Sequence, residues 1–164
     1  MKGLMLVMSF LAAILPLSAE QPVVRVEPSN LQGPRVLNDQ TRSGVIRDYL
    51  DAWQSMSAAF QQNRPGLLDR DFVGTAKEKL TDTIHSQVTM GISTRYLDQT
   101  HDLQIAFYSP EGLSIQLVDN VEYEVQVLDH GKVQGTHKMQ GRYVVVMTPA
   151  EVRWRVRVLQ GGPE

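Results

Sequence analysis

The sequence contains no cysteine, and this absence excludes several kinds of chemistry. Without cysteine the chain forms no disulfide, thiolate metal site or cysteine nucleophile, and it has no N-terminal cysteine for lipid attachment. Its four histidines are not spaced as metal ligands, since neither H-x-H nor H-E-x-x-H occurs. A nucleophile elbow, a phosphate-binding loop and a dinucleotide-binding glycine pattern are missing as well. The sequence therefore predicts no metal site and no cofactor.

A positive charge excess is also missing. The chain has 16 Lys and Arg against 18 Asp and Glu, a formal net charge of −2. A nucleic-acid binder normally gathers a basic excess on one face, so this class of partner is disfavoured. The 164 residues suit one domain with a real core, and 42% hydrophobic residues is ordinary for a globular protein.

Residues 1–19 have the pattern of a targeting segment. Lys2 supplies a positive start, an apolar run extends from Leu4 to Leu15, and Ser18-Ala19 offers small residues for cleavage. This pattern predicts a signal peptide and an exported protein, periplasmic or extracellular. Leu17 matches the cleavage pattern poorly, so an uncleaved N-terminal anchor stays open as an alternative. Membrane contact is expected only in that case. The run is shorter than the ~20 residues of a spanning helix.

Residues 20–37 are rich in proline and predict a linker, because proline prevents helices and shortens strand ladders. The apolar patch at Val23 to Val26 leaves an edge strand as the alternative. From a cap at Asn38 or Asp39, apolar residues recur at three- and four-residue spacing and predict an amphipathic helix that Pro65 ends. A second helix follows and ends at Gly91; its predicted apolar row consists of Ala76, Leu80, Ile84 and Val88.

From Ser93 the apolar period changes from about 3.6 to about 2, which is typical of strands. Turn sequences at residues 109–112, 129–132 and 148–151 divide the rest into a meander, with residues 161–164 as a loose tail. A sheet with one apolar face needs helices across that face. We therefore predict an α+β domain over residues 38–160, with N-terminal helices packed on a curved antiparallel sheet of four to five strands.

This order of elements, closed by a final strand of the pattern "RWRVRVLQ", resembles the nuclear-transport-factor-2-like, or polyketide-cyclase-like, superfamily. The resemblance covers residues 38–160 and rests on element order, not on a motif. It implies a cone-shaped fold with a pocket between helices and sheet. Members include isomerases, cyclases, dehydratases and non-catalytic binding domains, so the fold alone names no activity. Cystatin-type folds are the structural alternative.

Arg153, Arg155 and Arg157 alternate with Trp154, Val156 and Val158 in the last predicted strand. If the apolar set faces the core, the arginines face outward. We favour a solvated outer face of mixed charge, since charge rows are usually solvated. The alternative is an interface in which this arginine row meets glutamates of a second copy, a homodimer through the outer sheet face.

One acidic residue interrupts the apolar phase of the long strand. Asp119 shares the parity of Leu117 and Val121, so in an uninterrupted strand its carboxylate points inward. By the same rule His101 and His137 face the interior, and a carboxylate with histidine in an apolar pocket suits acid–base chemistry. We favour the alternative, a β-bulge within residues 118–122 that turns Asp119 outward.

The predicted function is an exported, non-enzymatic domain that binds a small apolar ligand or a protein partner in a pocket walled by Trp53, Tyr123 and Tyr143. The first alternative is an isomerase or cyclase that uses Asp119 with His101 or His137. The second is a homodimeric envelope accessory protein whose interface contains Arg153, Arg155 and Arg157. If Asp119 is exposed at a bulge, the isomerase or cyclase hypothesis is ruled out.

Overall fold

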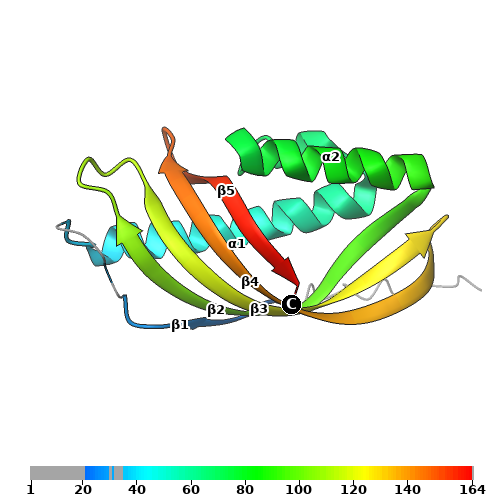
Figure 1. Cartoon of the computed structure of the whole chain (residues 1–164), viewed down its shortest axis with the longest axis horizontal. Coiled ribbons are helices and arrows are strands. Elements are labelled where there is room, and N and C mark those ends of the chain that lie inside the picture. The colour runs from blue at the N-terminus through cyan, green and yellow to red at the C-terminus, as the bar shows by residue number, and fades with distance from the viewer. Residues whose placement is uncertain (1–20, 30, 32–34, 164) are drawn as a thin grey trace, which may run out of the picture.

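The computed structural model describes residues 21–29, 31 and 35–163 (Figure 1), so the predicted signal peptide lies outside the described residues. These residues form two α-helices, one short 3-10 helix and one five-stranded sheet. The elements are β1 (Val23–Val26), α1 (Asp39–Gln62), η1 (Pro65–Leu68), α2 (Gly74–Met90), β2 (Ile92–Tyr108), β3 (Ile115–Asp129), β4 (Lys132–Pro149) and β5 (Trp154–Pro163). The predicted α+β class, with helices before the main strands, is confirmed.

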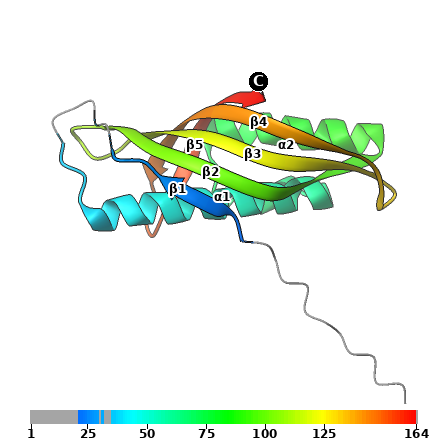
Figure 2. The same ribbon diagram turned by 90° about the horizontal axis from the view of Figure 1, so that it is seen from below.

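The sheet has the order β1-β2-β3-β4-β5 and is mixed. Strands β2 to β5 form an antiparallel meander, and β1 adds to the edge of β2 in parallel, with Val24 opposite His101. A purely antiparallel sheet was therefore the wrong prediction, and the patch at Val23 to Val26 forms the edge strand that the sequence left as an alternative. The sheet is curved, and both helices lie on its concave side (Figures 1 and 2).

Local chemistry sets the ends of both helices. The Asn38 side chain accepts a hydrogen bond from the backbone N–H of Thr41 at 2.8 Å and caps α1. Asn63 ends α1 in the left-handed conformation, just before Pro65, and Gly91 ends α2 with φ 70°. The predicted start of α1 and the predicted ends of both helices are thus confirmed.

The apolar row predicted for α2 is wrong at its C-terminal end. Ala76 and Ile84 are buried, but Val88 is 54% exposed. Residues four apart drift around a helix by about 40° at each step, so Val88 has turned away from the sheet. Gln87 is buried instead, and its amide donates to the backbone oxygen of Phe60 at 3.2 Å.

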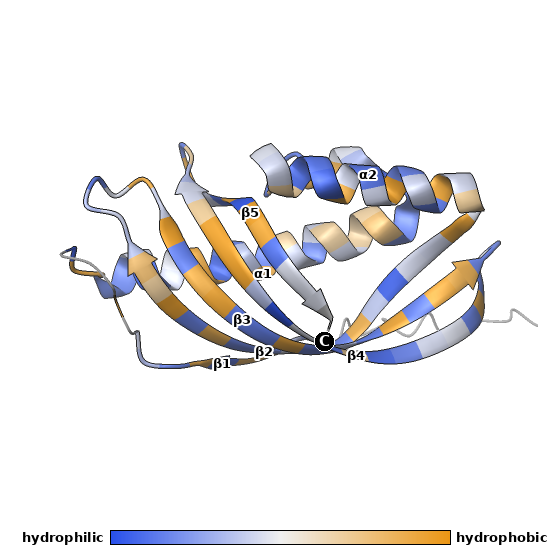
Figure 3. Ribbon diagram, viewed as in Figure 1, coloured by the Kyte–Doolittle hydropathy of each residue, from blue (hydrophilic) through white to orange (hydrophobic). Residues whose placement is uncertain are grey.

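The core lies between the helices and the concave face of the sheet. Orange and blue bands alternate along the strands in Figure 3, as expected for a sheet that buries one face. Each large apolar side chain buried there contributes about 1.5–3 kcal/mol. The fully buried apolar residues of the sheet are Leu103, Ile105, Ile115, Leu117, Val121, Val145, Met147 and Val156.

A bulge in β2 determines which side chains face this core. Asp98 and Gln99 both stand opposite Tyr123, since Leu97 pairs with Glu124 and Thr100 with Glu122, and Asp98 has φ 50°. An extra residue reverses the phase of a strand. Tyr96 before the bulge and His101 after it therefore both face inward, although their numbers differ in parity.

Strand β3 has no bulge at Asp119. Asp119 pairs with Leu103 of β2 and Tyr143 of β4, and the pairing with both neighbours is continuous over residues 118–122. The predicted bulge within residues 118–122 is therefore wrong. The bends of the sheet come from its neighbours: besides Asp98, the register of β2 shifts again between Ile105 and Phe107.

A further phase change lies in β5. Val158 pairs with Val146 but Val156 pairs with Met147, so Arg157 is the extra residue. Trp154 packs against the core and Val156 is buried, as predicted, but Leu159 takes the inner position expected for Val158. β5 also continues through residues 161–163, which the sequence predicted to be a loose tail.

Candidate functional site

A polar cluster lies inside the core, formed by Tyr49 of α1, His101 of β2 and Asp119 of β3. His101 and Asp119 are 0% exposed. Oδ2 of Asp119 accepts from the Tyr49 hydroxyl at 2.7 Å and lies 2.8 Å from Nδ1 of His101. The structure thus brings together the carboxylate and one of the two histidines that parity had paired with it.

His137 is not part of this cluster. It pairs with Val125 in the β3–β4 ladder, but its side chain is exposed. His85 and His130 are exposed as well, so His101 is the one buried histidine among the described residues, which include all four. The expectation that His137 faces an enclosed pocket is therefore wrong.

The cluster has one shared acceptor and two unused atoms. The Tyr49 hydroxyl donates to Oδ2 of Asp119, and Nδ1 of His101 lies within hydrogen-bond distance of the same oxygen. Burial, and then the charge of Asp119, raises the pKa of Tyr49 well above its usual value, so its hydroxyl keeps its proton. Among the residues that the structure describes, Nε2 of His101 and Oδ1 of Asp119 are buried without a hydrogen-bond partner. Each such atom destabilises a protein by about 1–3 kcal/mol.

Trp53 of α1 stands between this cluster and a cavity. Its ring centroid is 5.0 Å from that of His101 and 5.8 Å from those of Tyr123 and Tyr143. The hydroxyl oxygens of Tyr123 and Tyr143 are 3.3 Å apart. Burial raises the pKa of Tyr143 and raises that of Tyr96 to about 12.

The cavity has a volume of about 210 Å³ and lies between both helices and the sheet. It is lined by Trp53, Met56, Lys79, Leu80, Thr83, Tyr96, Tyr143, Leu159 and Gly161. Of the three predicted pocket walls, Trp53 and Tyr143 line it, whereas Tyr123 is buried against both of them. Gly161 has φ 113°, and a Cβ there would lie 2.0 Å from the backbone oxygen of Arg142, so only glycine fits.

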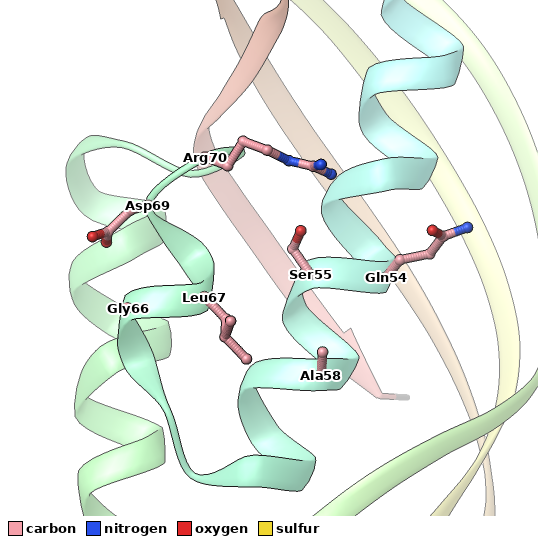
Figure 4. A pocket seen from close by; sticks show the side chains of 7 residues that line it. All are labelled: Gln54, Ser55, Ala58, Gly66, Leu67, Asp69 and Arg70. Carbon is pink, nitrogen blue, oxygen red and sulfur yellow. The ribbon is translucent and has the colours of Figure 1, made fainter.

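A larger hollow of about 500 Å³ lies between α1 and η1 (Figure 4). Its lining consists of Gln54, Ser55, Ala58, Gly66, Leu67, Asp69 and Arg70. None of these residues belongs to the buried cluster, and no aromatic side chain lines the hollow. We place the candidate site in the smaller cavity, because it has aromatic walls and one of them, Trp53, packs against the ring of His101.

The arginine row of the last strand is divided in the structure. Nη1 of Arg153 lies 2.6 Å from Oδ1 of Asp71, and Arg155 donates to the backbone oxygens of Asp69 and Phe72. Arg157 is exposed. The prediction of a solvated arginine row is therefore wrong for Arg153 and Arg155, which bond to the segment before α2.

Sequence reasoning missed Asp71, which is 0% exposed. Beside it Phe72 pairs with Val156 of β5 in parallel, and the N–H of Val73 donates to the Val156 oxygen at 2.9 Å. A buried aspartate usually has a charged partner, but the partner Arg153 is distant in the sequence. The one local sign of burial in the sequence was the position of Asp71 between Arg70 and the apolar Phe72.

Comparison with known proteins places the fold and leaves the activity open. No protein-family model and no curated protein matches the chain. The intermembrane-space region of the chloroplast protein ARC6 superimposes with a TM-score of 0.56 at 16% identity, covering 80% of this chain and 100% of that one. A provisionally named scytalone dehydratase of Novosphingobium aromaticivorans gives a TM-score of 0.48 at 13% identity, covering 76% and 87%.

At 16% identity the likeness to the ARC6 region concerns the fold alone. It supports the coarse form of the expected architecture, helices on a curved sheet, and says nothing of activity. Within the described residues, neither α1 nor α2 has the length and apolar character that crossing a membrane requires.

Proposed function

We propose that this chain is a ligand-binding domain that holds a small, mainly apolar molecule between its helices and the concave face of its sheet. The observation that carries the proposal is the cavity of about 210 Å³ with aromatic and aliphatic walls. A dry protein cavity of about 150 Å³ is enough to bind benzene. A molecule with one six-membered ring and short substituents therefore fits.

The walls and the mouth of the cavity have different chemistry. Trp53, Met56 and Tyr96 are supplied by α1 and β2 and offer rigid apolar surface. Lys79 and Thr83 of α2 line the cavity but are exposed, so they mark the side that opens to water. A ligand would enter beside α2 and place its ring against Trp53.

Fluorescence of Trp53 tests this proposal. The chain has two tryptophans, so Trp154→Phe leaves Trp53 as the sole reporter, on the cavity wall. Titration with toluene should change its emission until the signal saturates. Leu159→Phe in the same background fills the cavity and should abolish the response, whereas Leu67→Phe, in the hollow between α1 and η1, should preserve it. A folded protein whose Trp53 emission never saturates would contradict the proposal.

A second candidate is an isomerase or cyclase, and the contact of 2.8 Å between His101 and Asp119 favours it. A buried carboxylate beside an imidazole is an arrangement that moves protons. Binding is proposed first because Trp53 separates the pair from the cavity. Exchange of the ring protons next to the carbonyl of cyclohexanone, followed by NMR in heavy water, tests the enzyme. The enzyme candidate would be ruled out if the protein exchanged these protons no faster than buffer alone, or if the Asp119→Asn variant exchanged them as fast as the unsubstituted chain.

Two further expectations remain proposals. Export to the periplasm or the cell exterior rests on residues 1–19. A homodimer through the outer sheet face would have to use Arg157 and its neighbours, because Arg153 and Arg155 are engaged within the chain. Light scattering of the purified chain measures that state, and a monomer at high concentration would exclude the homodimer.

A further inference from the structure

The side chains that line the cavity of about 210 Å³ offer hydrogen bonds of one kind. Those with an N–H or O–H donor are Trp53, Lys79, Thr83, Tyr96 and Tyr143, and no carboxylate or amide side chain is among the lining residues. We infer that the cavity selects a small carboxylic acid, whose ring packs on Trp53 and whose carboxylate pairs with the Lys79 ammonium at the mouth. This inference rests on the proposed ligand-binding function and names the ligand class.

The charge of the lining is the first ground for an anionic ligand. Lys79 is the one charged residue among the lining residues. Lys77 of the same helix pairs with Asp69 at 3.0 Å, whereas Lys79 forms no ion pair with any residue that the structure describes. The acids nearest to it along α2, Glu78 and Asp82, are exposed. The Lys79 charge is therefore available to a ligand.

The tyrosines of the wall are the second ground, because they add donors and no negative charge. Burial raises the pKa of Tyr96 to about 12 and raises the pKa of Tyr143 above its usual value, so both hydroxyls keep their protons at neutral pH. An ammonium ligand would meet the like charge of Lys79 and find no carboxylate in the lining. A carboxylate meets an opposite charge and several donors.

The positions of Trp53 and Lys79 determine the shape of the acid. Trp53 is 3% exposed, whereas Lys79 is exposed at the side that opens to water. The ring and the carboxylate of the ligand must therefore be separated by a short arm. A carboxylate held at the mouth stays partly hydrated, which avoids the large cost of burying a charge.

The expected preference is moderate, because an exposed ion pair is weak. At low salt we expect an acid to bind about fivefold more tightly than a neutral compound of the same shape. The ratio should fall toward one in high salt, which screens exposed charges.

Proton–nitrogen NMR of the full chain near neutral pH tests the inference with three probes of one shape: 3-phenylpropionate, 3-phenylpropionamide and 3-phenylpropylamine. The indole N–H of Trp53 reports occupancy of the cavity. The indole N–H of Trp154, which does not line the cavity, is the control in the same spectrum and should not move. The acid should bind most tightly, the amide about fivefold more weakly, and the amine most weakly.

Variants of Lys79 test its part in this order. Lys79→Met should lower the affinity for the acid to that for the amide and leave the affinity for the amide unchanged. Lys79→Glu should reverse the order, so that the amine binds most tightly. Lys77→Met is the matched control, since it removes the same charge from the same helix at a residue outside the lining, and it should keep the preference for the acid.

The possible failures are distinguishable. Equal affinities for acid and amide, with Trp53 still shifting to saturation, would overturn the carboxylate class and leave the cavity proposal intact. Tightest binding of the amine by the unsubstituted chain would overturn the class in favour of a cation. A preference for the acid that survives Lys79→Met would overturn the pairing with Lys79. If none of the three probes and no toluene shifts Trp53, the cavity proposal itself fails.

Discussion

Two carboxylates of this protein, Asp71 and Asp119, are equally hidden from water and are held in opposite ways. Both are 0% exposed. Asp71, beside β5, contacts Arg70, Arg153 and the Ser55 hydroxyl. Asp119, in the middle of the sheet, contacts Tyr49 and His101 and keeps one oxygen unpaired. Two cations compensate the first carboxylate, and at most one compensates the second.

The difference separates a structural joint from a candidate site. The side chains of Arg70 and Arg153 are 58% and 23% exposed, so their charges stay partly hydrated while they hold the segment before α2 on β5. His101 has no access to water and depends on Asp119 alone. Both carboxylate oxygens of Asp71 are paired, so this carboxylate needs no further group. Where a carboxylate oxygen and a ring nitrogen are unpaired, as at Asp119 and His101, a further group is expected.

The largest expected effect comes from removing the interior carboxylate. Asp119→Ala should lower the free energy of unfolding by about 3–5 kcal/mol, because Tyr49 and His101 then lose their buried acceptor. Asp71→Ala is the matched control and should lower it by about 1–3 kcal/mol, because its arginines can turn to water. Urea unfolding measures both. Equal losses would show that the two carboxylates do not differ as described.

An intermediate loss of stability is expected at alkaline pH, because the interior region contains buried tyrosines. The pKa of Tyr96 is raised from 10.0 to about 12, so the folded state keeps a proton that the unfolded state loses. The contribution of Tyr96 to the free energy of unfolding is complete below pH 10 and is lost as pH rises toward about 12. In this range the free energy of unfolding falls by at most about 1.4 kcal/mol per pH unit. Tyr49 and Tyr143 shift in the same direction.

Urea unfolding between pH about 9 and about 11 measures this slope. Tyr96→Phe should reduce the slope, whereas Asp71→Asn, at the edge of the molecule, should leave it as it is in the unsubstituted chain. A stability that stays level over this range would contradict the prediction.

The smallest loss of stability is expected from a substitution at Arg70, beside Asp71. Arg70 lies 3.0 Å from Asp71 but is 58% exposed, and Arg153 remains when it is removed. Arg70→Ala should therefore cost less than about 1 kcal/mol, and the difference from the unsubstituted chain should shrink in high salt. Unfolding curves at low and high salt check this, and a loss of several kcal/mol would mean that Asp71 depends on both arginines.

Features encoded in short stretches of sequence were predicted correctly. The cap at Asn38, the stop at Pro65 and the turn at Gly131 depend on the local chemistry of one or two residues. The inward direction of His101 also followed from the sequence, because no bulge lies between it and Leu103. Parity predicts direction reliably over such short distances.

Features that depend on distant pairing were missed. No residue type marks the bulges at Asp98 and Arg157, because they arise from the fit of one strand to its neighbours. The contact between Asp71 and Arg153 joins residues 82 apart. The bulge expected at Asp119 was wrong for a related reason: the extra residues lie in β2 and β5, whereas the pairing of β3 with β2 and β4 stays continuous at Asp119.

The bulge in β2 also limits how this chain can change over generations. A substitution at Asp98 or Gln99 leaves the phase of the strand intact, whereas loss of either residue turns every side chain of residues 92–97 to the opposite face. Tyr96 would then leave the cavity and Leu97 would enter it, although no residue of the cavity had been replaced. Heritable changes in the length of β2, more than changes in its composition, therefore decide whether a descendant of this protein keeps its cavity.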